Sequence, residues 1–118
     1  MPVVNRYCLL GHVDPHRIAD YRRVHAAVWP ELLVALRDAG WRNYSLFLRE
    51  DGLLIGYVEA DDLDRAQAAI AATDVNTRWQ AAMSELFATD GPPDQAWEIV
   101  PEVFNLDEQL STVDEQGR

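Results

Sequence analysis

A strong β-hairpin signal lies in the middle of the chain. Residues 41–49 and 53–60 are rich in aromatic and aliphatic side chains, as strands usually are. Asp51-Gly52 lies between them, and this pair is typical of tight hairpin turns because both residues tolerate positive φ angles. The central part of the chain is therefore predicted to form two neighbouring antiparallel strands.

Helical and strand-like segments flank this hairpin on both sides. Apolar residues recur at helical spacing over residues 14–39 and residues 61–88, with Thr73 dividing the second stretch into two helices. Alternating apolar residues over 3–13 and 97–106 predict one further strand at each end. The order strand–helix–strand–strand–helix–strand predicts a ferredoxin-like α+β fold, in which helices cover one face of an antiparallel sheet.

Pro30 interrupts the first helical stretch. Asp14 and Pro15 supply an N-cap and a first-turn proline, and Gly40 is a natural end. Because proline removes a backbone donor inside a helix, we expect a break, with a second helical piece beginning at Pro30. Such breaks leave backbone polar groups in need of partners, which makes this bend a candidate edge of a binding site.

The predicted strands carry apolar residues on both faces. Trp41 and Phe47 are expected on the face opposite Tyr44. One layer of helices covers only one face, so a second copy of the sheet is expected on the other. We therefore expect a homodimer of the dimeric α+β barrel kind, with a single domain over residues 1–106 and a polar, mobile tail over residues 107–118.

The composition excludes several classes of function. A net charge of −10 and a pI near 4.5 oppose binding to nucleic acid and to anionic membranes. All 10 basic residues are arginines, so a lysine Schiff base is impossible. The chain has no apolar run long enough to span a membrane and no signal-peptide pattern. We expect a cytoplasmic protein that binds a small neutral molecule.

Metal and nucleophile motifs are not recognisable in the sequence. His12 and His16 form no metal-ligand spacing with His25. The single cysteine, Cys8, cannot form an internal disulfide. The serines lie in no nucleophile motif. A metal site is therefore not expected.

The first helix places three aromatic side chains on one face. Tyr21, His25 and Trp29 follow one another at steps of four residues, which brings them together along a helix. His25 is the leading catalytic candidate because an imidazole gives and takes protons near neutral pH. The alternative is a half-buried histidine that only packs or binds a backbone carbonyl, and residue types alone do not decide between the two.

Other aromatic residues suit a carbohydrate site. The chain has 4 tryptophans and 4 tyrosines, whose rings can pack on sugar C–H groups while their polar atoms reach hydroxyls. Tyr44 and Trp79 are candidates for such contacts, with ordinary core packing as the alternative for both. Trp41 and Trp97 are expected in the sheet or at an interface.

Four segments of the chain form an ordered set of motifs: "YRRVHAAVWPELL", "WRNYSLFL", "ATDVNTRWQ" and "EVFNL". Together they resemble the L-rhamnose mutarotase family, and the resemblance covers roughly residues 3–106. It implies a dimeric, cofactor-free and metal-free ferredoxin-like protein. Such a protein is an isomerase that interconverts the α and β anomers of L-rhamnose in the cytoplasm.

The resemblance also implies roles for individual residues. His25 falls on the family's proton donor, while Tyr21, Tyr44 and Trp79 fall on sugar-binding positions. The family often has a second tryptophan directly after Trp79, where this chain has Gln80. Gln80 is therefore a fifth candidate site residue, with an amide in place of an indole. The expected reaction is acid/base ring opening and closure of a small neutral monosaccharide.

Two other functions remain open from the sequence. A dimeric α+β barrel oxygenase or haem-handling protein is possible by analogy of fold alone. A non-catalytic sugar-binding module is also possible, because an aromatic pocket can bind without turnover. The sequence leaves open which sugar is preferred and whether Trp29 or Trp97 contacts it.

Overall fold

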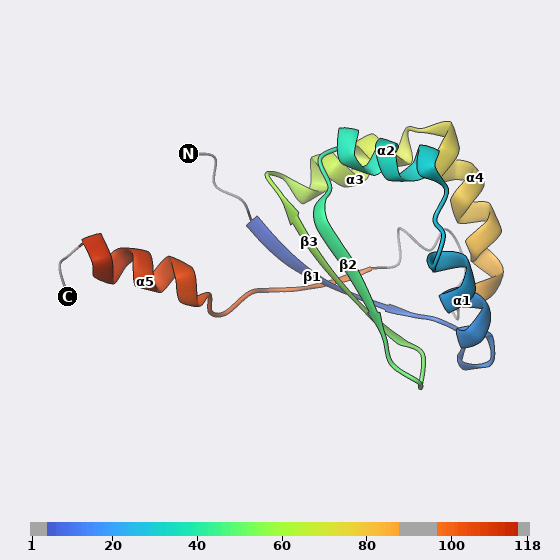
Figure 1. Ribbon diagram of the computed structural model, residues 1–118, viewed down its shortest axis with the longest axis horizontal. Helices are drawn as coiled ribbons and strands as arrows, with labels where there is room; N and C mark the ends of the chain where they lie inside the picture. The colour runs from blue at the N-terminus through green and yellow to red at the C-terminus, as the bar shows by residue number, and fades with distance from the viewer. Residues whose placement is uncertain (1–4, 88–96, 116–118) are drawn as a thin grey trace.

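The computed structural model describes residues 5–87 and 97–115, which form an antiparallel sheet with helices on one face (Figure 1). The sheet has four strands in the order β2-β3-β1-β4. These strands are β1 (Asn5–His12), β2 (Arg42–Leu48), β3 (Leu53–Ala60) and β4 (Glu98–Val100). The covering helices are α1 (Ile18–His25), α2 (Pro30–Asp38), α3 (Leu63–Ala71) and α4 (Asp74–Met83), with single 3₁₀ turns at Pro15–Arg17 and Ser84–Leu86. The predicted ferredoxin-like α+β fold is confirmed.

The sequence predicts some of the element boundaries closely and others only in part. β3 has the predicted bounds, whereas α4 ends at Met83, before the predicted end of that helix. Residues 3, 4 and 88 of the predicted elements lie outside the described residues. None of the helices within 5–87 and 97–115 combines the length and apolar character that a membrane crossing needs.

The two faces of the sheet differ in burial. On the face that the helices cover, Leu9, Leu54 and Val58 are completely buried. We call the other side the open sheet face; the register of the strands places on it Cys8, Leu10, Phe47, Ile55 and Tyr57. Phe47 keeps 58% of its surface exposed. Apolar side chains thus lie on both faces, as the sequence predicts.

The helix breaks before Pro30, as predicted. α1 ends at His25, and Trp29 has the non-helical angles φ −54° and ψ 128°. The Trp29 carbonyl accepts hydrogen bonds from the amides of Leu32 and Leu33, which satisfies the first turn of α2. Pro30 occupies the first helical position, where its missing N–H costs nothing. The break turns the chain, so that α1 and α2 pack on different parts of the sheet.

A bulge at the start of β2 overturns one prediction. Asn43 has a φ of 48°, and the pairing of β2 with β3 shifts register between Arg42 and Ser45. This extra residue breaks the alternation of side chains along the strand. Trp41 and Tyr44 therefore lie on the same, covered face, with ring centroids 4.8 Å apart. The expectation that they lie on opposite faces was wrong.

The C-terminal part of the chain leaves the sheet. β4 covers only three residues, because Pro101 has no N–H with which to continue the ladder. Asn105 then caps a further helix, α5 (Leu106–Glu115), by accepting a hydrogen bond from the Glu108 amide at 3.0 Å. The polar tail expected over residues 107–118 is helical in its described part. This helix is not anticipated from the sequence.

Helix α5 makes the molecule elongated. Figure 1 shows it beyond the end of the sheet at which β1 begins, far from α1–α4. The molecule measures 53 × 31 × 23 Å, with a radius of gyration of 16.3 Å. A compact chain of this length has a radius of about 13.5 Å. The difference arises because α5 does not pack on the body of the protein.

Candidate active site

A cavity of about 330 Å³ lies between the covered face of the sheet and helices α1, α2 and α4. This volume suits a small ligand such as a single sugar ring. Its lining includes residues with polar side-chain groups, which are Tyr21, His25, Tyr44, Asn76 and Gln80, and the rings of Trp41, Trp79 and Trp97. Among the described residues, no carboxylate or guanidinium lines it. The lining therefore favours a neutral ligand with several hydroxyl groups.

His25, the last residue of α1, has a defined tautomer. Its Nδ1 lies 2.9 Å from the backbone carbonyl oxygen of Tyr21. A carbonyl oxygen only accepts hydrogen bonds, so Nδ1 carries the hydrogen and Nε2 carries the lone pair in the neutral ring. Burial lowers the pKa of His25, and the bond to the Tyr21 carbonyl partly offsets this effect. Near neutral pH the imidazole is therefore an uncharged base at Nε2.

The Tyr21 ring holds the imidazole in place. The two rings stack with centroids 3.9 Å apart and an angle of 17° between their planes. The edge of Phe87 supports Tyr21 from another side, at 5.8 Å between centroids. Tyr21 is 4% exposed, and burial raises the pKa of its phenol. The phenol thus stays protonated and can donate a hydrogen bond.

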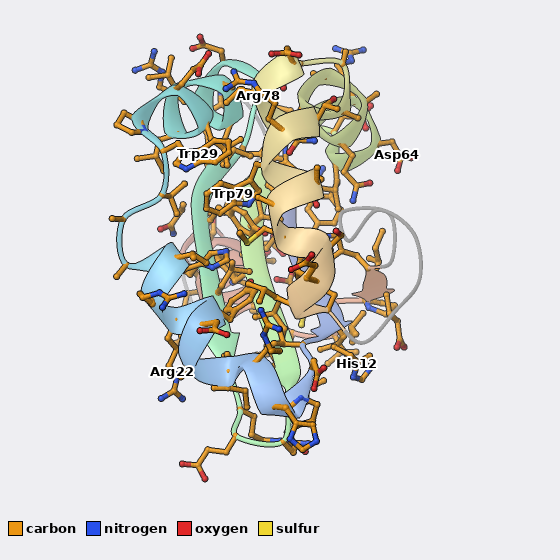
Figure 2. All side chains as sticks on the ribbon, turned by 90° about the vertical axis from the view of Figure 1, so that its right-hand side faces the viewer. His12, Arg22, Trp29, Asp64, Arg78 and Trp79 are labelled. Carbon is orange, nitrogen blue, oxygen red and sulfur yellow. The ribbon has the colours of Figure 1, made fainter. Side chains whose placement is uncertain are left out.

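Trp79 forms the wall beside the imidazole. Its ring meets that of His25 nearly at a right angle, with centroids 5.5 Å apart. Trp29 in turn packs edge-on against Trp79 at 4.9 Å. Figure 2 shows the two tryptophans side by side between α4 and the segment that joins α1 to α2. Trp29 does not itself line the cavity, so it supports Trp79 from behind.

The sheet supplies the opposite wall. Because of the bulge at Asn43, Tyr44 and Trp41 both face the cavity. The Trp41 indole donates a hydrogen bond to the Ala66 carbonyl at 3.1 Å, so it offers a ligand only its ring. Trp97 also lines the cavity. The sequence favours a sheet or interface position for Trp41 and Trp97 and leaves open whether Trp97 reaches the site, and the structure places both rings in the lining of the cavity.

Two amides on α4 face the same cavity. Gln80 donates a hydrogen bond from Nε2 to Oδ1 of Asn76 at 3.2 Å. Asn76 is 5% exposed, a rare degree of burial for an amide side chain. Sequence reasoning identifies Gln80 but misses Asn76. The available signal was spacing, because Asn76 lies one turn before Gln80 and three residues before Trp79.

The remaining histidines and the paired arginines lie outside the site. His12 and His16 are exposed, and Figure 2 shows His12 and Arg22 at the surface, pointing away from Trp79. No group of three or more metal-ligating side chains occurs in the part of the chain that the structure describes. All five predicted site residues, by contrast, line one cavity.

Comparison with known proteins identifies the family. The sequence model of the family described as L-rhamnose mutarotase matches residues 6–106. The chain belongs to this family. A curated L-rhamnose mutarotase of Ligilactobacillus salivarius is 37% identical over 100 residues, which cover 81% of this chain and 92% of that protein. The match to the family spans α1, α2, β2 and α4, which build the cavity.

Solved structures share the mutarotase fold. An L-rhamnose mutarotase of Formosa agariphila matches with a TM-score of 0.69 and 24% identity, covering 86% of this chain and 98% of the other. A monooxygenase of Streptomyces coelicolor, solved with nanaomycin D, matches with a TM-score of 0.54 and 18% identity, covering 86% and 89%. At these identities the likeness shows the fold alone. Fold similarity therefore does not separate a mutarotase from a monooxygenase, whereas the sequence match is to the L-rhamnose mutarotase family.

Proposed function

We propose that this protein interconverts the α and β anomers of L-rhamnose, or of a closely related neutral sugar, as an isomerase. One observation carries the proposal: a neutral imidazole with a defined tautomer faces a cavity whose lining is aromatic and uncharged. Membership of the L-rhamnose mutarotase family supports the same conclusion. An oxygenase or a haem site has no comparable support from the lining residues.

Ring opening begins with the uncharged base. Nε2 of His25 accepts the proton of the anomeric hydroxyl O1, and a C1=O1 double bond forms as the C1–O5 bond breaks. O5 then takes up a proton. Because O1 and O5 are both bonded to C1, the imidazolium can deliver to O5 the proton that it took from O1. The same group thus serves as base and then as acid.

Ring closure reverses these steps after a rotation. The open aldehyde turns about its C1–C2 bond, so that O5 attacks the other face of the carbonyl. His25 removes the O5 proton and returns a proton to O1, which leaves the enzyme unchanged. Water already catalyses this exchange slowly, so acid/base assistance of about 10²–10⁴-fold is sufficient. The proposed chemistry requires neither a metal nor a cofactor.

Tyr21, Tyr44, Trp79 and Gln80 are proposed to bind the sugar. The raised pKa of Tyr21 keeps its hydroxyl available as a donor. Trp79 offers an indole beside the imidazole, where a sugar's C–H face can pack against it. Gln80 adds an amide that can bind a hydroxyl. These contacts would hold C1 close to His25, which is the main requirement for proton transfer.

A homodimer is proposed as the working form of the protein. The open sheet face carries apolar side chains that the described helices do not cover, with Phe47 58% exposed. A second copy of the same face is the simplest cover, because one two-fold axis buries both at once. A cytoplasmic location, which the family resemblance implies, is part of the same proposal.

NMR saturation exchange at the anomeric proton tests the activity directly. Wild-type protein is expected to accelerate exchange of L-rhamnose, and His25→Ala is expected to abolish the acceleration. A panel of L-rhamnose, L-fucose, L-lyxose and D-glucose then measures sugar preference. Saturable binding without exchange would support a binding module instead. A Soret band on haem addition, or oxygen uptake with a quinol, would favour the oxygenase alternative.

A further inference from the structure

The segment after β4 forms an arm that stands away from the body of the protein. This C-terminal arm comprises residues 101–115: an extended part from Pro101 to Asn105, followed by α5. Figure 1 shows α5 projecting past the sheet, well separated from α1–α4. The family match ends at residue 106, where α5 begins. The helix is therefore an addition of this chain to the part that the family shares.

Ion pairs of Arg6 hold the base of the arm in place and set the direction in which it leaves the sheet. Nε of Arg6, at the start of β1, pairs with Glu102 at 2.8 Å, and another nitrogen of the same guanidinium pairs with Glu108 at 2.7 Å. One guanidinium thus bridges the extended part and the first turn of α5. Asn105, between these carboxylates, caps the helix. The arm is consequently directed outward rather than folded back over its own sheet.

The arm exposes an unusual amount of apolar surface. Val103 is 97% exposed and Phe104 59%. Along α5, Leu106, Leu110 and Val113 are 56%, 46% and 38% exposed, and their spacing places them in one stripe. An isolated helix of ten residues is marginal in water unless such a stripe is packed. The described chain offers this stripe no packing surface of its own.

The same chain carries a second uncovered apolar surface, the open sheet face. A projecting apolar arm and an uncovered apolar face within one chain are complementary when two copies meet about a two-fold axis. Each copy then covers the face of the other, and each arm lies beside the body of the other. A partner of different sequence would leave one set of these surfaces exposed. A second copy of this chain is therefore the partner that covers both the arm and the open sheet face.

We propose that the C-terminal arm packs on the second copy in the homodimer. Val103, Phe104 and the stripe of Leu106, Leu110 and Val113 lie against that copy beside its open sheet face, so that the two copies clasp each other. This inference rests on the homodimer proposed above and adds its means of attachment. The extended part of the arm lies within the family match, which ends at residue 106, so the contribution of Leu110 and Val113 is the part of the clasp that lies beyond the matched residues.

Leu110→Asp tests the clasp by placing a charge in the stripe. Ser111→Asp is the matched control, because it adds the same charge one residue later, about 100° further round α5 and off the stripe. In sedimentation equilibrium, Leu110→Asp is expected to raise the dimer dissociation constant at least about tenfold, since each dimer loses two buried leucines. Ser111→Asp is expected to leave it near the wild-type value. Equal effects, or none from Leu110→Asp, overturn the proposal.

Cross-linking identifies the surface that the arm contacts. Phe104 is replaced by photoreactive benzoylphenylalanine, and chains grown in ¹⁴N and ¹⁵N media are mixed before irradiation. Cross-linked peptides of mixed isotope, joining the arm to β2 or β3 of the other chain, are the expected result. Cross-links confined to single chains show that the arm folds back on itself and overturn the proposal.

The outcomes separate the clasp from the proposals on which it rests. A wild-type chain that sediments as a monomer overturns both the clasp and the homodimer. A dimer that survives Leu110→Asp unchanged overturns the clasp alone. Anomer exchange is measured on the same samples and reports on the isomerase proposal independently, since no arm residue lines the cavity.

Discussion

The imidazole of His25 stacks on the phenol ring of Tyr21 at 3.9 Å, while its Nδ1 binds the Tyr21 carbonyl at 2.9 Å. One residue thus sets both the plane of the imidazole and its tautomer. The stack prevents the ring from swinging out of the cavity, and the carbonyl keeps Nε2 unprotonated in the neutral form. Tyr21 is therefore expected to act on the reaction through His25 as well as on the sugar.

Substitutions at Tyr21 separate these two roles. Tyr21→Phe keeps the stacked ring and the carbonyl and removes only the hydroxyl, so kcat/KM is expected to fall about tenfold or less. Tyr21→Leu removes the stacking ring and is expected to lower kcat/KM roughly a hundredfold, because a misplaced base loses reactivity steeply. The measurement is NMR anomer exchange at several sugar concentrations. Equal losses in the two variants would contradict a positioning role for the ring.

The activity is expected to depend on pH through His25. Burial lowers the pKa of this imidazole below its ordinary value of 6.5, and the proposed base is the neutral form. Activity should therefore be level above pH 6.5 and fall as pH drops through the lowered pKa. Profiles of kcat/KM between pH 4.5 and pH 8 measure this midpoint. A midpoint above pH 6.5 would contradict an uncharged resting base.

Folding stability should also depend on pH, because the pKa of His25 is lower in the folded protein than in the unfolded chain. Between the lowered pKa of folded His25 and the pKa of the unfolded histidine, the unfolded chain binds more protons. The free energy of unfolding therefore rises with pH across that window. The part of it that comes from keeping His25 neutral in the folded protein is lost as the pH falls below about 6.5. Urea titrations compare wild type with His25→Asn, which has no titrating group. A wild-type slope no steeper than that of the variant would refute the expectation.

Gln80 is expected to contribute binding rather than proton transfer. Gln80→Leu keeps a similar volume and removes the amide that bonds Asn76. KM for the sugar should rise roughly three- to thirtyfold with kcat nearly unchanged, because the contact is the same in ground and transition states. Gln67→Leu is the matched control, because Gln67 lies on α3 and does not line this cavity. A loss in kcat alone would assign Gln80 a different role.

The bulge at Asn43 is expected to depend on the positive φ of that residue. Asn43→Ala should be about 1 kcal/mol less stable to urea than Asn43→Gly, because alanine resists this conformation and glycine does not. Both variants lose the hydrogen bond from Asn43 to Glu59, so the comparison isolates the backbone. Because the bulge orients Trp41 and Tyr44, Asn43→Ala should also raise KM. Equal stability of the two variants would contradict this explanation.

Most of the fold was predictable because its signals are local. The Asp51-Gly52 turn, the break at Pro30 and the end at Gly40 each depend on the backbone preferences of one or two residues. The structure gives Gly52 and Gly40 φ angles of 97° and 101°, as such positions require. The order of strands and helices follows from these boundaries, and the fold follows from the order.

The failures arise where an outcome depends on distant parts of the chain. A single residue at positive φ reverses which face Trp41 occupies, and no alternation of residue types reveals that reversal. Trp97 reaches the cavity only because β4 pairs with β1, a contact between the two ends of the chain. The stripe of α5 is present in the sequence. Its packing surface, by our proposal, belongs to another molecule.

The position of His25 at the very end of α1 has an electrostatic consequence. At this end the single Ala26 amide serves both the Arg22 and the Arg23 carbonyl, and the aligned peptide dipoles give the helix end a partial negative charge. When the imidazole takes a proton from the sugar, its new positive charge lies against this end of the helix. Burial opposes the charge in the resting protein, and the helix end lowers its cost during the reaction. Because α1 ends before Pro30, the base lies at a helix end that stabilises its imidazolium form while the proton is being transferred.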